Sequence, residues 1–163
     1  MRTRPRERSL ETHQTSRRRE RGQALVEFAL LLPVLLAVLF LVVDFGVGIS
    51  RWVVVTNAAR EAARLGASGE DSITAIQQKA VQSSAGLLEE ADVTVTYRDI
   101  GDNNSEADRG DSVKVKAAYE YGLITPLRAL LDLGFDSITL EGCADMRLEV
   151  PLPGVATVSA NGC

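Results

Sequence analysis

The sequence has little of the side-chain chemistry that most enzymes use. It contains one histidine, His13, and two cysteines, Cys143 and Cys163, among its 163 residues. Because His13 lies in an arginine-rich N-terminal stretch, the rest of the chain offers no Ser/His or Cys/His pair and no histidine metal site. No glycine-rich phosphate-binding loop follows a strand pattern. We therefore expect a protein that is not an enzyme and that binds no metal or cofactor.

Positive charge is concentrated at the N-terminus. Residues 1–22 hold eight arginines and three glutamates, a net charge of +5, whereas the whole chain carries −4. Residues 1–21 also have almost no apolar side chains, which predicts a disordered basic leader. Nucleic-acid binding would be one explanation, but no aromatic residues are interleaved with the arginines. An apolar run follows the leader directly, so we expect the charge to set membrane topology and expect no nucleic-acid partner.

The apolar run is long enough to cross a membrane. No charged residue occurs from Phe28 to Val43, and the apolar character continues to Ile49 past Asp44 alone. A helix over residues 23–49 would be about 40 Å long, more than the roughly 30 Å of a bilayer core. The alternatives are a buried helix of a soluble domain and a cleaved secretory signal. The run exceeds the length of a signal core, and no small-residue cleavage site follows it. A retained transmembrane helix is the prediction.

The distribution of arginine predicts the orientation of this helix. Eight arginines precede the apolar run and few follow it closely, which places the N-terminus in the cytoplasm and residues 51–163 outside the cytoplasmic membrane. Cys143 and Cys163 both lie in the outward part, where an oxidising compartment would allow them to pair. We expect a disulfide between them; a free Cys163 or a bond to another subunit are the alternatives.

The sequence pattern of the outward part predicts an α+β head. Small and apolar residues at helical spacing continue the long helix as a stalk to about residue 65, with Gly66 as the stop. The period then changes to two, which predicts an antiparallel sheet packed on the alanine-rich face of the stalk. The expected elements are a second helix over 71–84, strands over 93–98, 113–121 and 138–150, and a short helix from Thr125 to Gly134. The predicted divisions are a leader (1–22), a transmembrane and stalk helix (23–66) and a head (67–163).

Three stretches of the sequence resemble one known family. They are residues 21–33 (RGQALVEFALLLP), residues 44–46 (DFG) and residues 56–64 (TNAAREAAR), and they resemble TadE-like proteins of the Flp/Tad pilus assembly family. The resemblance implies a pilin-like fold and a minor pseudopilin, a structural or priming component of a type IV-like pilus. Its implied partners are the membrane, other pilins and pseudopilins, and a prepilin peptidase. It could also imply incorporation into an extracellular pilus.

The resemblance also implies roles for particular residues. The prepilin peptidase would cut between Gly22 and Gln23, which makes Glu27 the fifth residue of the mature chain. Gln23 departs from the pattern, since type IV pilins usually begin with a large apolar residue. A carboxylate near the end of a membrane span needs a partner, and the new amine at Gln23 would lie one helical turn away. Such a pair would fix the register between subunits.

Other interpretations of these residues stay open. Glu27 would also suit the membrane interface, where its carboxylate can reach the head groups. Asp44 could pair with Arg51, pair with a basic residue of another subunit, or mark the outer interface. For the whole chain, the alternative is an uncleaved, single-pass membrane-anchored domain for binding or sensing. The mature N-terminus distinguishes these functions.

Overall fold

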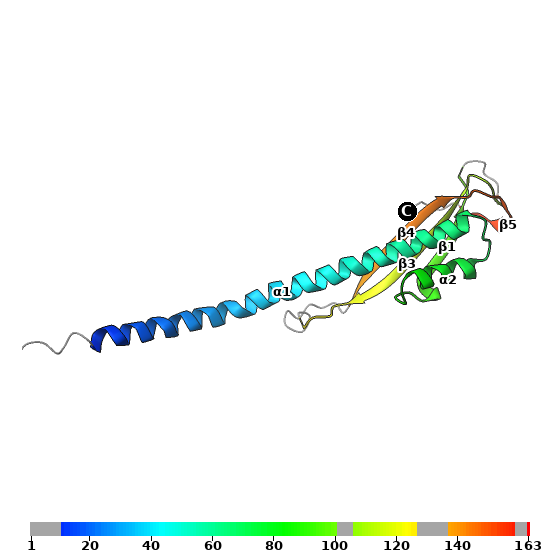
Figure 1. Cartoon of the computed structure of the whole chain (residues 1–163). Helices are drawn as coiled ribbons and strands as arrows, with labels where there is room; N and C mark the ends of the chain where they lie inside the picture. Colours follow the sequence, from blue (N-terminus) through cyan, green and yellow to red (C-terminus); the bar gives the residue numbers. More distant parts are fainter. Residues whose placement is uncertain (1–10, 101–105, 127–136, 159–162) are drawn as a thin grey trace, which may run out of the picture. The chain divides into compact units, whose positions relative to one another are not determined.

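The computed structural model describes residues 11–100, 106–126, 137–158 and 163, with side chains from residue 22 onward. Its fold is α+β, with a long N-terminal apolar helix, a second helix and a three-stranded antiparallel sheet, as predicted (Figure 1). The elements in chain order are α1 (Glu11–Ala67), α2 (Ile73–Ser83), the 3-10 turn η1 (Glu90–Asp92), β1 (Val93–Arg98), β2 (Glu106–Ala107), β3 (Ser112–Gly122), β4 (Ser137–Arg147) and β5 (Leu152–Ala156).

The chain divides into two compact units. The N-terminal unit comprises Met1–Val43, and the second, which we call the head unit, comprises Asp44–Cys163. The sequence placed the start of the head at residue 67, but residues 44–67 of α1 already belong to the head unit. The reason is that the alanine-rich face of this part of α1 is buried in the core.

The core of the head unit lies between the sheet, α1 and α2. The sheet has the strand order β1-β3-β4, with both pairs antiparallel, and Val115 of β3 lies between Val95 and Ala144. The prediction that the sheet packs on the alanine-rich face of the long helix is confirmed. The buried side chains of this core include Val55, Ala58, Ala59, Ala62 and Ala63 of α1, Ile76 and Ala80 of α2, and Val93, Val95, Val113, Val115, Ala117 and Ala144 of the sheet.

Small residues allow α1 and β4 to approach closely. A Cβ atom placed on Gly142 would lie 2.8 Å from the backbone nitrogen and Cα of Thr56. Real Cβ atoms do not approach other atoms so closely, and the atoms met here are backbone atoms that cannot turn aside. Gly142 therefore lies on the inner face of the sheet, and glycine is required there for a steric reason.

The predicted ends of the long helix were wrong at both sides. α1 begins at Glu11, within the leader that was predicted to be disordered, because residues 11–21 contain no proline or glycine and are rich in arginine and glutamate, which favour helix. It ends at Ala67, not before Gly66. Gly66 lies inside the helix, and its missing side chain leaves room for Ile76 and Val113, whose methyl groups would lie 3.0 and 3.1 Å from a Cβ atom.

A second, two-stranded sheet of β2 and β5 was not predicted. Pro153 lies within β5. Its missing N–H is tolerated because β5 registers with β2 at Leu152 and Ala156. β4 ends at Arg147, three residues before the predicted end at 150. Most of the short helix predicted between Thr125 and Gly134 lies outside the described residues.

Candidate functional site

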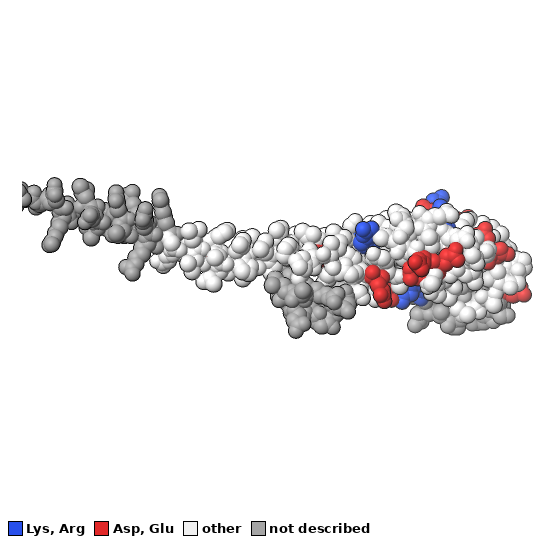
Figure 2. All heavy atoms as spheres, turned by 90° about the horizontal axis from the view of Figure 1, so that it is seen from below, with Lys and Arg blue, Asp and Glu red and all other residues white. Residues whose placement is uncertain are grey.

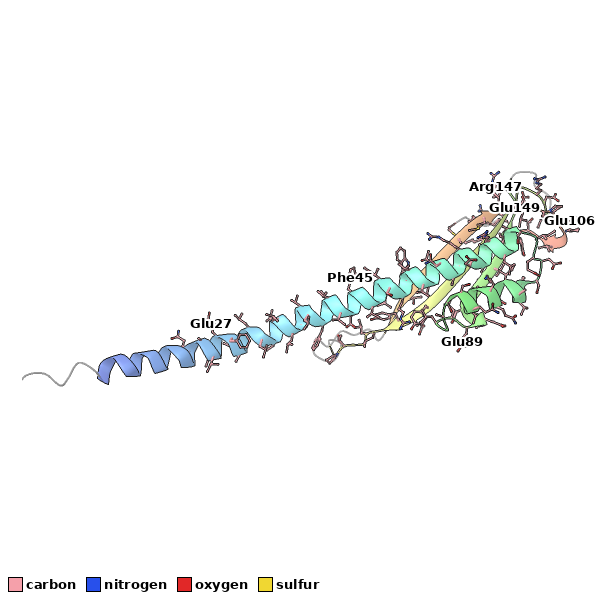
Figure 3. All side chains as sticks on the ribbon, in the orientation of Figure 1. Glu27, Phe45, Glu89, Glu106, Arg147 and Glu149 are labelled. Carbon is pink, nitrogen blue, oxygen red and sulfur yellow. A yellow bond between two sulfur atoms is a disulfide. The ribbon has the colours of Figure 1, made fainter. Side chains whose placement is uncertain are left out.

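The residues that the sequence assigned to processing lie on the surface of α1. Gly22, Gln23 and Glu27 are all exposed, and a Cβ atom on Gly22 would meet nothing within 4 Å. Residues 23 and 27 are four apart on a helix and therefore lie on one face, one turn from each other. Figure 3 shows the side chain of Glu27 projecting from α1. A cationic amine at residue 23, of the same chain or of a neighbouring copy, could therefore reach this carboxylate.

The bond between Gly22 and Gln23 lies inside a helix, because α1 begins eleven residues earlier at Glu11. A peptidase that binds its substrate in an extended form must unwind this turn first. Glycine lowers the cost of unwinding, since it is about 1 kcal/mol less favourable than alanine inside a helix. Gly22 thus provides both an open surface and a weak point in the helix at the expected cleavage position.

Asp44 is a buried carboxylate within the head unit. Its side chain is only 4 % exposed and accepts hydrogen bonds from the backbone N–H groups of Ile124 and Thr125, at 3.0 and 3.2 Å. The Thr125 hydroxyl donates a third bond to the same carboxylate. The three donors fix the turn after β3 against the first helical turn of the head unit. Charge-assisted bonds of this kind are stronger than neutral ones, which explains how a carboxylate can be buried here.

Tyr121, near the end of β3, supports the same junction. Its hydroxyl donates to the backbone carbonyl of Asp44 at 3.2 Å, and its ring lies 3.6 Å from the position of a Cβ atom on Gly48. Because Gly48 has no side chain, the ring of Tyr121 can pack against α1 at this point. Asp44, Tyr121 and Thr125 together make a polar junction, which we call the Asp44 junction, between residues about eighty positions apart in the sequence.

The Asp44 junction adds an interaction that the sequence interpretations of Asp44 did not include. Pairing with Arg51, pairing with another subunit and a place at the outer interface were the interpretations, whereas the structure shows the carboxylate accepting hydrogen bonds from the backbone of Ile124 and Thr125. Nothing in the sequence signals a pairing across eighty residues.

Trp52 forms a second link between α1 and the sheet that the sequence did not reveal. Its indole N–H donates to the backbone carbonyl of Glu141 on β4 at 3.1 Å, while about half of the side chain remains exposed. Glu141 in turn forms an ion pair with Lys116 on β3 at 2.9 Å. The tryptophan is therefore held in place at one edge and presents the rest of its ring to the surroundings.

A disulfide joins Cys143 on β4 to Cys163, the pairing that the sequence analysis expected. The Cα atoms are 5.8 Å apart, within the normal range, and the two residues are separated by 20 positions. Closing a loop of this size stabilises the folded state by roughly 3 kcal/mol on the chain-entropy view. The bond ties the C-terminus to the outer face of the sheet.

The head unit also contains an open cleft of about 410 Å³ beside the edge of β1. Its lining is mainly apolar and includes Asp71 and Tyr97. Burial, together with the negative charges of Asp71 and Glu70, raises the pKa of the Tyr97 hydroxyl. The hydroxyl therefore stays protonated and donates to the backbone carbonyl of Glu70 at 3.0 Å. Among the described residues, no group of three or more His, Cys, Asp or Glu side chains is arranged to hold a metal ion.

Comparison with known proteins gives one match. The family model for TadE-like proteins matches residues 22–64, which confirms the resemblance read from that segment of the sequence. The match begins at Gly22 and includes Glu27 and Asp44. No curated protein and no solved structure matches the chain. In the same region, α1 is long and apolar enough to cross a membrane, and it lies near the N-terminus. The match thus points to a component associated with Flp/Tad pili.

Proposed function

We propose that this chain is a minor pseudopilin of the TadE type, a structural or priming component of a Flp/Tad pilus. It is anchored in the cytoplasmic membrane by α1, with its N-terminus in the cytoplasm and the head unit outside. A prepilin peptidase removes residues 1–22, and the chain then joins other pilins and pseudopilins. Its role is structural and involves no catalysis.

The observation that supports this proposal most strongly is where the family match begins. It starts at Gly22, the residue after which the cut is expected, and continues through the apolar part of α1. Glu27 lies five residues after Gly22 and is exposed, so its carboxylate is available to an amine at residue 23. An uncleaved anchored domain for binding or sensing would share the membrane helix but would need neither of these two residues.

The Gly22→Val variant should remain uncleaved. A β-branched side chain at this position removes the open surface on the N-terminal side of the bond and also stiffens the helix turn that must unwind. In cells with an active prepilin peptidase, we expect the variant to retain residues 1–22, and intact mass spectrometry of membrane-extracted protein measures this directly.

Gly46→Val is the matched control for this experiment. Gly46 also lies in α1, and a Cβ atom there would meet nothing within 4 Å, so the substitution tests valine in an open helical position away from the cut. The control should mature to the wild-type N-terminus. Cleavage of Gly22→Val to the same N-terminus as wild type would show that the proposed cut site is wrong.

A further inference from the structure

The cleft beside β1 follows an edge of the three-stranded sheet. β1 is the outer strand in the order β1-β3-β4, so one of its sides pairs with β3 and the other does not pair within this sheet. The cleft is lined by Val95 and Tyr97 of β1, by Ile73 at the start of α2, by Val155 of β5 and by Val158. All of these residues belong to the head unit. The cleft is therefore the open side of an edge strand within one compact unit.

Two contacts show which backbone groups of β1 face this edge. The side-chain amide of Gln77 donates to the carbonyl of Val93 at 2.8 Å. The backbone N–H of Val158 donates to the carbonyl of Tyr97, also at 2.8 Å. Alternate residues of an antiparallel strand direct both backbone groups to the same side, so the N–H and C=O of Val95 face the edge as well. No residue in the described part of the chain bonds either group there.

The opening along β1 suits a short extended segment. Val93 and Tyr97 are four residues apart, which is about 13 Å along a strand. Gln77 occupies one end of this stretch and Val158 the other, so about three residues of an added strand fit between them. Val158 also forms an isolated parallel bridge with Arg98. The edge therefore already accepts strand pairing at one of its ends.

The charge at the cleft favours a basic residue in that segment. Asp71 is an exposed part of the lining, and the described residues provide no ion pair for it. Burial, together with the negative charges of Asp71 and Glu70, raises the pKa of the Tyr97 hydroxyl, so both carboxylates act on the lining. The head unit holds ten Lys and Arg against eighteen Asp and Glu, a net charge of −8. Like charge disfavours a second copy of this unit as the occupant.

We propose that the edge of β1 binds an extended segment of a protein partner that carries apolar side chains and one lysine or arginine. Its backbone bonds to the N–H and C=O of Val95. Its apolar side chains pack against Ile73 and Val155, and its basic side chain faces Asp71. In this mode of recognition, backbone bonds at a sheet edge give affinity and the side-chain contacts give specificity. The inference goes beyond the proposed function and needs neither cleavage nor assembly into a pilus.

Binding of terminally blocked hexapeptides tests the inference. Valine alternates with threonine in each peptide, and a single lysine is moved through every position so that all registers are sampled. Fluorescence anisotropy of labelled peptides with the full-length protein in detergent measures the affinity. We expect the tightest peptide to bind about tenfold more weakly when its lysine is replaced by glutamate, because a like charge then faces Asp71.

Methylation of the peptide backbone tests the pairing with Val95. Two adjacent N–H groups of a strand point to opposite sides, so only one of them can face β1. N-methylation of that residue should weaken binding by about tenfold, because it removes a hydrogen bond, whereas N-methylation of its neighbour should change little. Equal affinities of the two methylated peptides would show that the segment does not pair with the edge and would overturn the inference.

Two variants of the protein test the role of Asp71. Asp71→Lys should weaken binding of the tightest peptide by about tenfold. Glu149→Lys makes the same change of charge at an exposed position outside the cleft and should leave the affinity within about twofold. Equal losses in both variants would mean that the peptide is attracted only by the overall charge, which contradicts the inference. It is likewise overturned if no peptide of the panel binds at about 1 mM.

Discussion

Gly142→Ala should destabilise the head unit more than any other single added methyl group described here. The new Cβ atom would lie 2.8 Å from the backbone of Thr56, so the helix and β4 must move apart or the backbone must distort. Overpacking of this kind costs about 3 kcal/mol, because the atoms met are backbone atoms with no alternative rotamer. For a head of this size, that corresponds to a fall of about 10 °C in the midpoint of thermal unfolding. Circular dichroism of the detergent-solubilised protein measures the change.

Gly122→Ala is the matched control for strand glycines. Gly122 ends β3, and a Cβ atom there would meet nothing within 4 Å, so the same methyl group should change the midpoint little. Equal midpoints for Gly142→Ala and wild type would show that α1 does not pack on β4 as closely as described. The buried alanines of α1 would then have a different partner.

Glu27→Leu should insert into the membrane as well as wild type but fail to support a pilus. Removing a carboxylate from the end of an apolar segment removes an energetic penalty for insertion, so the amount of membrane-bound protein should not fall. The amine created at Gln23 would lose its partner one helical turn away, and with it the register between neighbouring subunits. We expect near-complete loss of surface pili, counted by electron microscopy of cells that carry only the variant.

Two comparisons make this result interpretable. Glu27→Gln should retain part of the function, because its amide oxygen can still accept a hydrogen bond from the amine. Processing of Glu27→Leu should be followed in the same cells, since an uncleaved variant would fail for a different reason. Normal pili with a cleaved Glu27→Leu variant would show that the carboxylate serves only the membrane interface.

The sequence predicted the parts of the fold whose signals are periodic. The alternating valines of residues 93–97 and 113–117 identified β1 and β3, and the repeat of alanines in residues 58–63 identified the buried face of α1. These patterns arise because one face of each element is buried, so apolar residues recur at the spacing of a strand or of a helix. The disulfide could also be predicted, because the sequence contains only two cysteines that can pair.

The parts that could not be predicted depend on single contacts between distant residues. Asp44 looked like an interruption of the apolar run until its partners at Ile124 and Thr125 were seen, eighty residues away. The indole N–H of Trp52 on α1 donates to a backbone carbonyl of β4. Because the acceptor is not a side chain, the sequence does not indicate it. β2 consists of two residues only, which is too short for any alternation to appear.

Acidic side chains, red in Figure 2, lie on the face of the head unit that this view shows, whereas the leader is rich in arginine. After removal of residues 1–22 the chain would change from a net charge of −4 to −9, because the leader carries +5. Processing would thus remove the basic segment, which the proposed topology places in the cytoplasm, and leave an acidic mature protein. This change is a consequence of the cut itself and needs no rearrangement of the head unit.

The mature N-terminus tests the central claim most directly. Protein extracted from the membranes of cells that make pili is purified without reductant, and its first residues are determined by N-terminal sequencing together with intact mass. The account predicts that the chain begins at Gln23 and that its mass corresponds to residues 23–163 with the Cys143–Cys163 disulfide intact. A chain that still begins at Met1 or Arg2 would contradict it and would favour an uncleaved anchored domain.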